Sequence, residues 1–220
     1  LDDYEKIAAN CVFYKQSPDQ RNRFLRLEPG EPVPPNGLMV VARDPFWIRD
    51  SSLPGIAAYM DELKAIDSIF PYHHELALNM VKWYEMIVDR LQGGNFQSLQ
   101  ATWISSYLQW CDTLLERNPR HADVHMFRAQ ALFRSAMFLK NENTNSLLNQ
   151  SIDEWETVME LSPITSSHRR AYAFTLSAIG KYYEQNGESE RALTFKTRAS
   201  EISAQADELE KKRAQAQLYQ

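Results

Sequence analysis

Glycine and cysteine are scarce in this chain of 220 residues, which contains 7 glycines and 2 cysteines. Few glycines mean few tight turns, and with 44% hydrophobic and 24% charged residues the composition favours a folded helical protein. Cys11 and Cys111 lie far apart and form no CxxC motif, so they define neither a zinc site nor a disulfide framework. We expect both to be buried thiols, because free cysteine behaves as a small apolar residue.

Long apolar runs and an excess of positive charge are also absent. The run at residues 37–42 is far shorter than the roughly 20 residues of a membrane helix, and no signal-peptide pattern is present. A net charge of -5 with no basic stripe argues against a nucleic-acid partner. The chain opens at Leu1, which indicates a fragment whose missing part could include a membrane anchor. The compartment, periplasmic or cytoplasmic, stays open.

Proline is concentrated near the amino end. Seven of the 10 prolines lie between residues 17 and 54, namely Pro18, Pro29, Pro32, Pro34, Pro35, Pro45 and Pro54. Because proline blocks helix interiors, this part should be extended, with one short strand at residues 38–41, after an amphipathic helix at residues 2–16. The apolar cluster at residues 44–48 should dock on the rest of the chain. We therefore predict an amino-terminal region over residues 1–54.

Residues 55–220 show helical periodicity throughout. A first helix should start near Ser51 or Ser52 and bury Ile56, Tyr59, Met60, Leu63, Ile66 and Phe70. Stop-and-turn signals then separate six more predicted helices, at residues 74–91, 96–117, 122–139, 146–161, 167–185 and 188–213. The separators are short, so these six helices should form three antiparallel hairpins.

Three of the predicted helices end in a similar phrase, which indicates an internal repeat. The phrases are Ser68-Ile69-Phe70-Pro71, Glu116-Arg117-Asn118-Pro119 and Glu160-Leu161-Ser162-Pro163. The last unit resembles the tetratricopeptide repeat, with Leu176, Ile179, Gly180, Tyr183, Gly187, Ala192 and Ala199 at the family's spacing. In this resemblance Gly180 and Ala192 are small where the helices approach, Tyr183 fills the wedge, and Gly187 ends the first helix with a positive φ.

The earlier units diverge from the family. Their closing prolines are 119 - 71 = 48 and 163 - 119 = 44 residues apart, whereas the family's period is about 34. The excess should fall inside the hairpins, around residues 90–100 and 141–149. The resemblance implies an all-α fold of antiparallel hairpins stacked as a right-handed superhelix over residues 55–220. The polar final helix, in which Ala204 replaces the terminal proline, should cap the array.

Catalytic and metal-binding motifs are not found in the sequence. His73-His74-Glu75 lacks the second histidine of the H-E-x-x-H pattern, because Leu78 stands in its place. His121 and His125 could share a helix face as metal ligands, but two hydrated histidines near a helix start are the better interpretation. No P-loop, GxGxxG or GxSxG motif is present. We therefore expect no enzyme activity, no metal and no cofactor.

The resemblance implies a protein or peptide partner bound in a concave groove lined by the first helix of each hairpin. Apolar side chains among charges of both signs suit an amphipathic segment. The positions carried over from the family are Glu75, Leu78, Lys82 and Glu85 in the first unit, Asp123, Met126, Gln130 and Phe133 in the second, and Phe174, Ser177 and Lys181 in the third.

A second resemblance concerns the soluble domains of bacterial O-antigen ligases and polymerases. The proline-rich segment with Asp44-Pro45-Phe46, followed by degenerate repeats with Phe70-Pro71-Tyr72-His73, is similar to such domains. It implies a periplasmic domain of a membrane enzyme whose catalytic residues lie outside this chain. A purely structural spacer is the third alternative. The partner and the oligomeric state do not follow from the sequence.

Overall fold

The computed structural model describes residues 60–61, 63–64, 67, 74–90, 97–139 and 142–217. The chain divides into two compact units, residues 1–86 and 87–220. The predicted boundary after Pro54, the helix at residues 2–16, the strand at residues 38–41 and Cys11 lie outside the described residues and stay predictions. Of the helix expected after Ser52, Met60 and Leu63 are described, and both are buried as expected.

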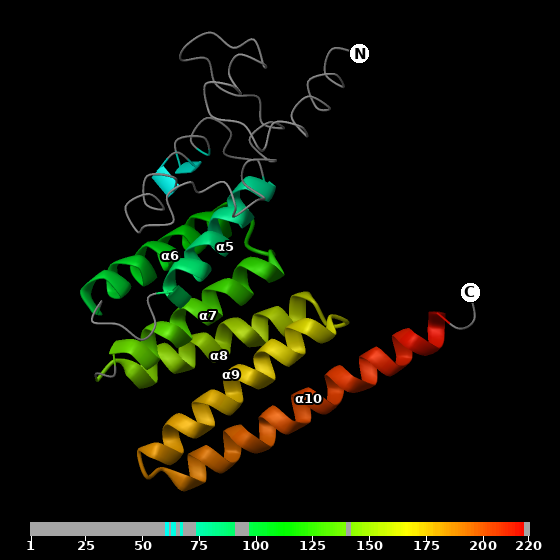
Figure 1. Ribbon diagram of the computed structural model, residues 1–220. Coiled ribbons are helices and arrows are strands. Elements are labelled where there is room, and N and C mark those ends of the chain that lie inside the picture. Colours follow the sequence, from blue (N-terminus) through cyan, green and yellow to red (C-terminus); the bar gives the residue numbers. More distant parts are fainter. Residues whose placement is uncertain are drawn as a thin grey trace, which may run out of the picture. The chain divides into compact units, whose positions relative to one another are not determined.

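Helices make up the described part of the chain (Figure 1). Their bounds are α5 His74–Arg90, α6 Gln97–Arg117, α7 Ala122–Leu139, α8 Thr144–Leu161, α9 Ser166–Gln185 and α10 Ser189–Gln217. These bounds confirm the six predicted helices, and no end is shifted by more than four residues. The excess length of the second hairpin goes into its helices rather than a long loop, because α7 ends at Leu139 and α8 begins at Thr144. Among the described residues no helix is long and apolar enough to cross a membrane.

In the first unit, Met80, Val81, Trp83 and Tyr84 of α5 are buried together with Met60 and Leu63. Lys64 lies over the Tyr84 ring, 5.9 Å from its centroid, and pairs with Asp61 at 3.5 Å. Burial raises the pKa of Tyr84, although the nearby Lys64 opposes the shift. The apolar stripe of α5 therefore faces a core, as the helical spacing predicted.

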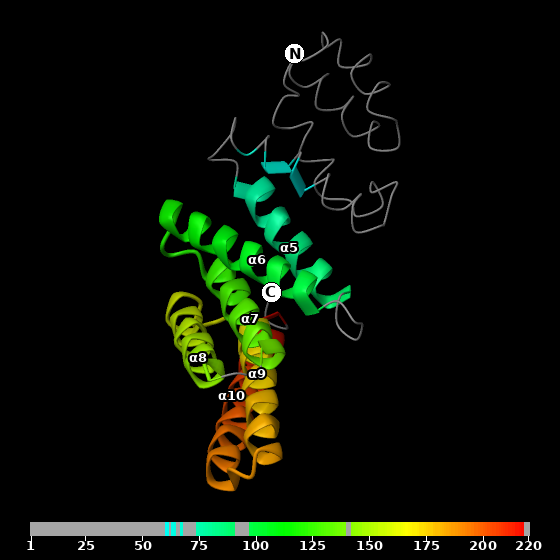
Figure 2. The same cartoon turned by 90° about the vertical axis from the view of Figure 1, so that its left-hand side faces the viewer.

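In the second unit, α7 packs mainly on α8 and α9 mainly on α10, which confirms two of the predicted hairpins (Figure 2). α6 packs along α7, and α9 contacts both α7 and α8. Two clusters of buried side chains run through all four helices of these hairpins. One consists of Ala129, Trp155, Val158, Tyr172, Leu176 and Ala199, and the other of Ala136, Leu148, Ile179, Tyr183 and Ala192. The hairpins are therefore stacked on a shared core.

The turn between α9 and α10 has the geometry that the repeat predicted. Gly187 has a φ of 80°, its N–H bonds the Glu184 carbonyl at 3.1 Å, and the Glu188 N–H bonds the Tyr183 carbonyl at 2.9 Å. These two bonds form a Schellman motif, which satisfies carbonyl groups at the end of α9. An L residue at position 187 would be strained, so glycine fixes where α9 ends.

The buried residues of α10 are Ala192, Ala199 and Ala206, which are seven residues apart. α10 therefore packs on α9 along a line of small side chains. A Cβ atom added at Gly180 would lie 3.2 Å from the Ala192 carbonyl oxygen and 3.0 Å from Lys196 Cγ. This close approach confirms the predicted role of Gly180. α10 extends past the start of α9 in Figure 1, and its outer face is exposed and mostly polar, as expected for a helix that caps an array.

Candidate functional site

The predicted groove positions on α5 belong to the first unit. Lys82 is exposed, while Leu78 and Glu85 are half-buried. Glu75 lies in α5, but its side chain falls outside the described residues. Their assignment to one groove with the second-unit positions stays a prediction.

On α9 the predicted positions include the most exposed aromatic side chain among the described residues. Phe174 is 75% exposed, although it lies in the middle of the helix. Lys181 is exposed and has no ion pair among the described residues, and Ser177 is half-buried between them. Seven residues make nearly two helical turns, so Ser167, Phe174 and Lys181 lie on one line along α9. We call this line of three residues the α9 stripe.

On α7 the predicted positions are less open than expected. Met126 packs against the buried cluster around Trp155, and Phe133 packs against the cluster around Tyr183. Both side chains are half-buried, as are Asp123 and Gln130, and the Gln130 Oε1 atom is fully buried. The expectation that Met126 and Phe133 stand exposed is therefore not met. The reason is that both clusters contain residues of α8, α9 and α10, which cover part of these side chains.

The description of His125 as a hydrated side chain is wrong. Its Nδ1 lies 2.6 Å from Glu154 Oε2 and its Nε2 lies 2.9 Å from the Pro119 carbonyl oxygen. Arg128 Nη1 donates to the other Glu154 oxygen at 2.5 Å, and Arg128 Nε donates to Asp112 at 2.7 Å. These bonds tie α6, α7 and α8 together. No sequence motif indicated this network, because the side chains that bond to each other lie 16 to 29 residues apart in the sequence.

Opposing effects act on the guanidinium of Arg128. Burial lowers its pKa, but the hydrogen bond to Asp112 and the charges of Glu154 and Asp112 outweigh burial and raise the pKa overall. Glu154 is only 17% exposed, so its carboxylate is poorly hydrated and would be costly without its paired cationic partner. The network therefore has a structural role, joining the helices of the second hairpin to each other and to α6.

A second polar network joins α8 to the third hairpin. The Tyr172 hydroxyl donates to Glu156, and Arg198 pairs with the same carboxylate. The Tyr172 ring stacks on Trp155, with centroids 5.5 Å apart. Burial and the hydrogen bond to Glu156 raise the pKa of the Tyr172 hydroxyl well above its usual value. The Tyr172 hydroxyl therefore stays protonated and joins α9 to α8, while Arg198 joins α10 to the same carboxylate.

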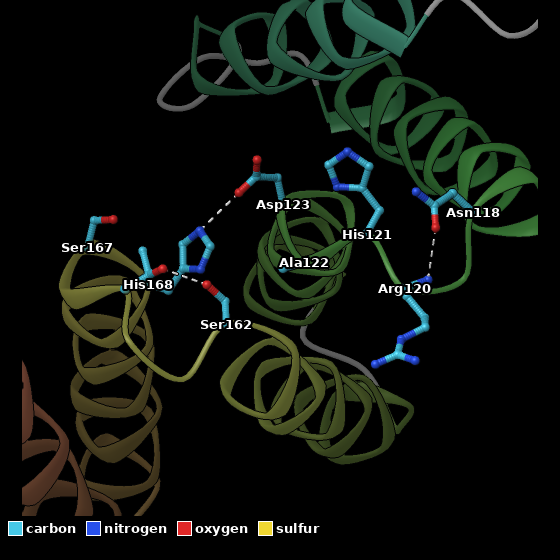
Figure 3. A pocket seen from close by; sticks show the side chains of 9 residues that line it. Asn118, Arg120, His121, Ala122, Asp123, Ser162, Ser167 and His168 are labelled. Carbon is cyan, nitrogen blue, oxygen red and sulfur yellow. Dashed lines mark hydrogen bonds and ion pairs between the residues drawn. The ribbon is translucent and has the colours of Figure 1, made fainter.

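A polar cavity of about 590 Å³ lies where the α6–α7 and α8–α9 turns meet (Figure 3). It is lined by Asn118, Arg120, His121, Ala122, Asp123, Ser162, Thr165, Ser167 and His168. His168 Nε2 lies 3.0 Å from Asp123 Oδ1, so this contact joins α9 to α7. The sequence offered one signal for the cavity, because both turns follow the recurring proline phrase. Of the predicted groove residues, only Asp123 lines it.

In the described part of the second unit, α7–α8 and α9–α10 form two hairpins stacked on a shared core, and α6 packs along α7. No protein-family model matches the chain, and no curated protein matches it. Two solved structures are similar. MamA MSR-1 C2 shares 14% identity at a TM-score of 0.51, covering 91% of this chain and 96% of that one. TTC0263, a thermophilic TPR protein of Thermus thermophilus, shares 16% identity at a TM-score of 0.50, covering 98% of both chains.

The chain therefore has a tetratricopeptide-repeat-like fold, which confirms the prediction made from residues 173–204 and the degenerate repeats before them. At these identities the likeness concerns the fold alone. Nothing in the comparisons supports the second resemblance, to soluble domains of O-antigen ligases or polymerases.

Proposed function

We propose that this chain is a non-catalytic protein–protein interaction module that binds a peptide or a partner helix along the α9 stripe. Arrays of stacked hairpins present extended surfaces, and such surfaces recognise extended or helical segments. The observation that carries the proposal is the position of Phe174. Its side chain is 75% exposed on a helix whose neighbouring residues Tyr172 and Leu176 are fully buried.

The backbone beneath Phe174 is held rigidly, which favours a binding role for the ring. Tyr172, Leu176 and Ile179 anchor α9 in the shared core, so Phe174 is fixed in direction without being covered. Aromatic side chains on rigid elements are common anchors at protein interfaces. Lys181, about 10 Å further along the same face by helix geometry, supplies a charge that a partner could pair.

The α7 positions contribute a smaller share of the proposed surface. Met126 and Phe133 expose only part of their side chains, because they pack against the two core clusters. They can support a ligand at the edge of the α9 stripe, but their substitution would also disturb the core clusters. A test of binding must therefore use Phe174 by itself rather than Phe174 together with Phe133.

The test is selection of a random peptide display library on three versions of the full chain: wild type, Phe174→Ser and Leu193→Ser. Leu193 is 66% exposed on α10 and lies outside the α9 stripe, so it is a matched control for loss of an exposed apolar side chain. We expect peptides that bind wild type and Leu193→Ser but not Phe174→Ser. Urea unfolding should show both variants within about 0.5 kcal/mol of wild type, as is usual for exposed positions.

Two results would count against the proposal. Peptides that bind all three versions equally would move the binding surface away from Phe174. A selection that enriches no peptide on wild type would contradict a peptide-binding function.

A further inference from the structure

The turn that joins α9 to α10 carries a chemically reactive pair of residues, which has no part in the proposed function (Figure 1). Asn186 is followed by Gly187. An asparagine loses its amide nitrogen most readily when glycine follows it, because glycine has no side chain to hinder attack on the neighbouring amide. Both residues are exposed, and a Cβ atom added at Gly187 would meet no heavy atom of the described residues within 4 Å. Water and base can therefore reach the pair.

The reaction needs only the chain, base and water. The Gly187 backbone nitrogen gives its proton to base and attacks Asn186 Cγ. A bond forms between these two atoms, the bond from Cγ to Nδ2 breaks, and ammonia leaves. One water molecule then opens the resulting five-membered succinimide, either to aspartate or to isoaspartate, in which the backbone runs through the side-chain carbon atoms. A carboxylate thus replaces the amide without an oxidant or a cofactor.

The closed turn holds the two reacting atoms apart. Asn186 has a φ of -92° and a ψ of 6°. A ψ near zero makes the Gly187 nitrogen eclipse the backbone nitrogen of Asn186. The succinimide ring is nearly planar, so its formation requires the Gly187 nitrogen to eclipse the Cβ atom of Asn186 instead. The peptide between the two residues must therefore rotate before the ring can close.

Hydrogen bonds of the turn resist that rotation. The Gly187 N–H donates to the Glu184 carbonyl at 3.1 Å, and Asn186 Nδ2 donates to the Tyr182 carbonyl at 2.8 Å. The attacking nitrogen and the leaving amide are both engaged, so the turn must open before they can react. We infer that Asn186 is a latent deamidation site, which the closed α9–α10 turn protects and whose reaction records each opening of that turn.

Deamidation of Asn186 weakens the turn that protected it. The product carboxylate cannot donate to the Tyr182 carbonyl, and it places a negative charge at the negative end of the α9 dipole. Isoaspartate also lengthens the backbone, so the two bonds of the Schellman motif lose their register. The modification therefore converts a transient opening into a lasting change at the end of the third hairpin.

The test is peptide mass spectrometry of the full chain after incubation at mildly alkaline pH, in buffer and in denaturing urea. Asn36 and Gly37 form the other Asn–Gly pair of the sequence, and they provide the reference in urea. We expect Asn186 and Asn36 to react at similar rates in urea. In buffer, Asn186 should react at least about tenfold more slowly than in urea, because only molecules with an open turn can react.

Hydrogen exchange of the Gly187 amide measures the opening independently. Exchange and deamidation both need a free Gly187 nitrogen, so the two rates should rise together as urea is added below the unfolding transition. Asn186→Gln is the control for the assignment. Its ring would have six members and form slowly, so the mass gain at position 186 should disappear.

Asn186→Asp reproduces one product and tests its effect on the turn. It should speed hydrogen exchange of the Gly187 amide, because the bond to the Tyr182 carbonyl is lost. Gln185→Glu, at the exposed preceding position, is the matched control for adding one negative charge near the end of α9. It keeps the Asn186 amide and should change the exchange less.

Equal rates of Asn186 deamidation in buffer and in urea would overturn the inference, as would a rate that does not follow Gly187 exchange. An Asn186 that stays unmodified in urea would contradict the chemistry itself. Equal Gly187 exchange in Asn186→Asp and Gln185→Glu would show that the modification does not weaken the turn.

Discussion

The hairpins α7–α8 and α9–α10 share one core but are joined by different side chains. Close approach of Gly180 and Ala192, together with stacking of Tyr183 on Phe195 at 5.5 Å, holds α9 to α10. In α7–α8, charged groups of low exposure take on much of that task, with Glu154 paired to both His125 and Arg128. The hairpin that matches the repeat pattern uses small and aromatic residues with exposed ion pairs, and the divergent one has an ionic network of low exposure.

This contrast shows that a repeat signature describes one way of joining two helices. Where a hairpin departs from the signature, other interactions can add to its apolar contacts, and here they include ion pairs of low exposure. Breaking such a pair leaves an uncompensated charge, whereas disturbing a close helix approach introduces overpacking. The two hairpins should therefore respond differently to substitution.

The strongest destabilisation is expected for Glu154→Ala. The substitution leaves His125 and Arg128 without their shared carboxylate, at 13% and 24% side-chain exposure. We expect a loss of about 3 kcal/mol in the free energy of unfolding, measured with urea. Glu160→Ala, at an exposed position of the same helix, should change stability by less than about 0.5 kcal/mol. Equal effects of the two variants would show that the network is not what joins α7 to α8.

The next effect tests the third hairpin. Gly180→Leu should force α9 and α10 apart, because even a Cβ atom meets the Ala192 carbonyl at 3.2 Å. The expected loss is about 1 to 3 kcal/mol. Ala204→Leu, at an exposed position of α10, provides the control for adding the same side chain. An unchanged melting temperature for Gly180→Leu would contradict the close approach.

A pH-dependent effect of about 1 kcal/mol is expected at Tyr172, where Tyr172→Phe removes the hydrogen bond to Glu156. Burial and that bond raise the pKa of Tyr172 above the value of about 10 in the unfolded chain. Below pH 10 both states keep the proton, so the loss on substitution is constant. Above about pH 10 the unfolded chain releases this proton and the folded protein retains it, so wild-type stability falls as pH rises.

The check is the difference in unfolding free energy between wild type and Tyr172→Phe, measured from pH 7 to pH 11. We expect the difference to shrink above about pH 10. A difference that grows over this range would mean that the hydroxyl favours the ionised form in the folded protein.

The weakest effect is expected for Arg170→Ser. Arg170 pairs with Asp207 at 3.1 Å and with Glu210 at 2.6 Å, but all three side chains are about half exposed. Solvent screens such pairs, so the loss should stay below about 1 kcal/mol and decrease with added salt. A loss as large as that of Glu154→Ala would show that exposed and semi-buried pairs are equivalent in this fold.

The sequence predicted the helices and the third hairpin well because those features depend on local spacing. Gly187 ends α9 through its own φ. Gly180 and Tyr183 contact Ala192 and Phe195 in α10, which is the next helix along the chain. The ionic network and the polar cavity could not be predicted in the same way. The partners of Glu154 and His168 lie 26 to 45 residues away and meet only when the hairpins stack.

The groove prediction was limited by the same cause. Family spacing predicts which face of α7 and α9 would line a groove, but not how far neighbouring helices cover that face. Phe174 stays exposed, whereas Phe133 is drawn into the core beside Tyr183. Exposure at a groove position depends on the angle between adjacent hairpins, and that angle is set by packing across the whole array.

The proposed function requires that the partner contacts the α9 stripe. Contact with another exposed apolar side chain would not support it. The most direct measurement is photo-crosslinking of a peptide selected on wild type to chains that carry p-benzoylphenylalanine at position 174 or at position 193. Both positions are exposed, so both probes can react with a bound segment. We expect crosslinking at position 174 and none at position 193, and crosslinking at 193 alone or equally at both would contradict the proposal.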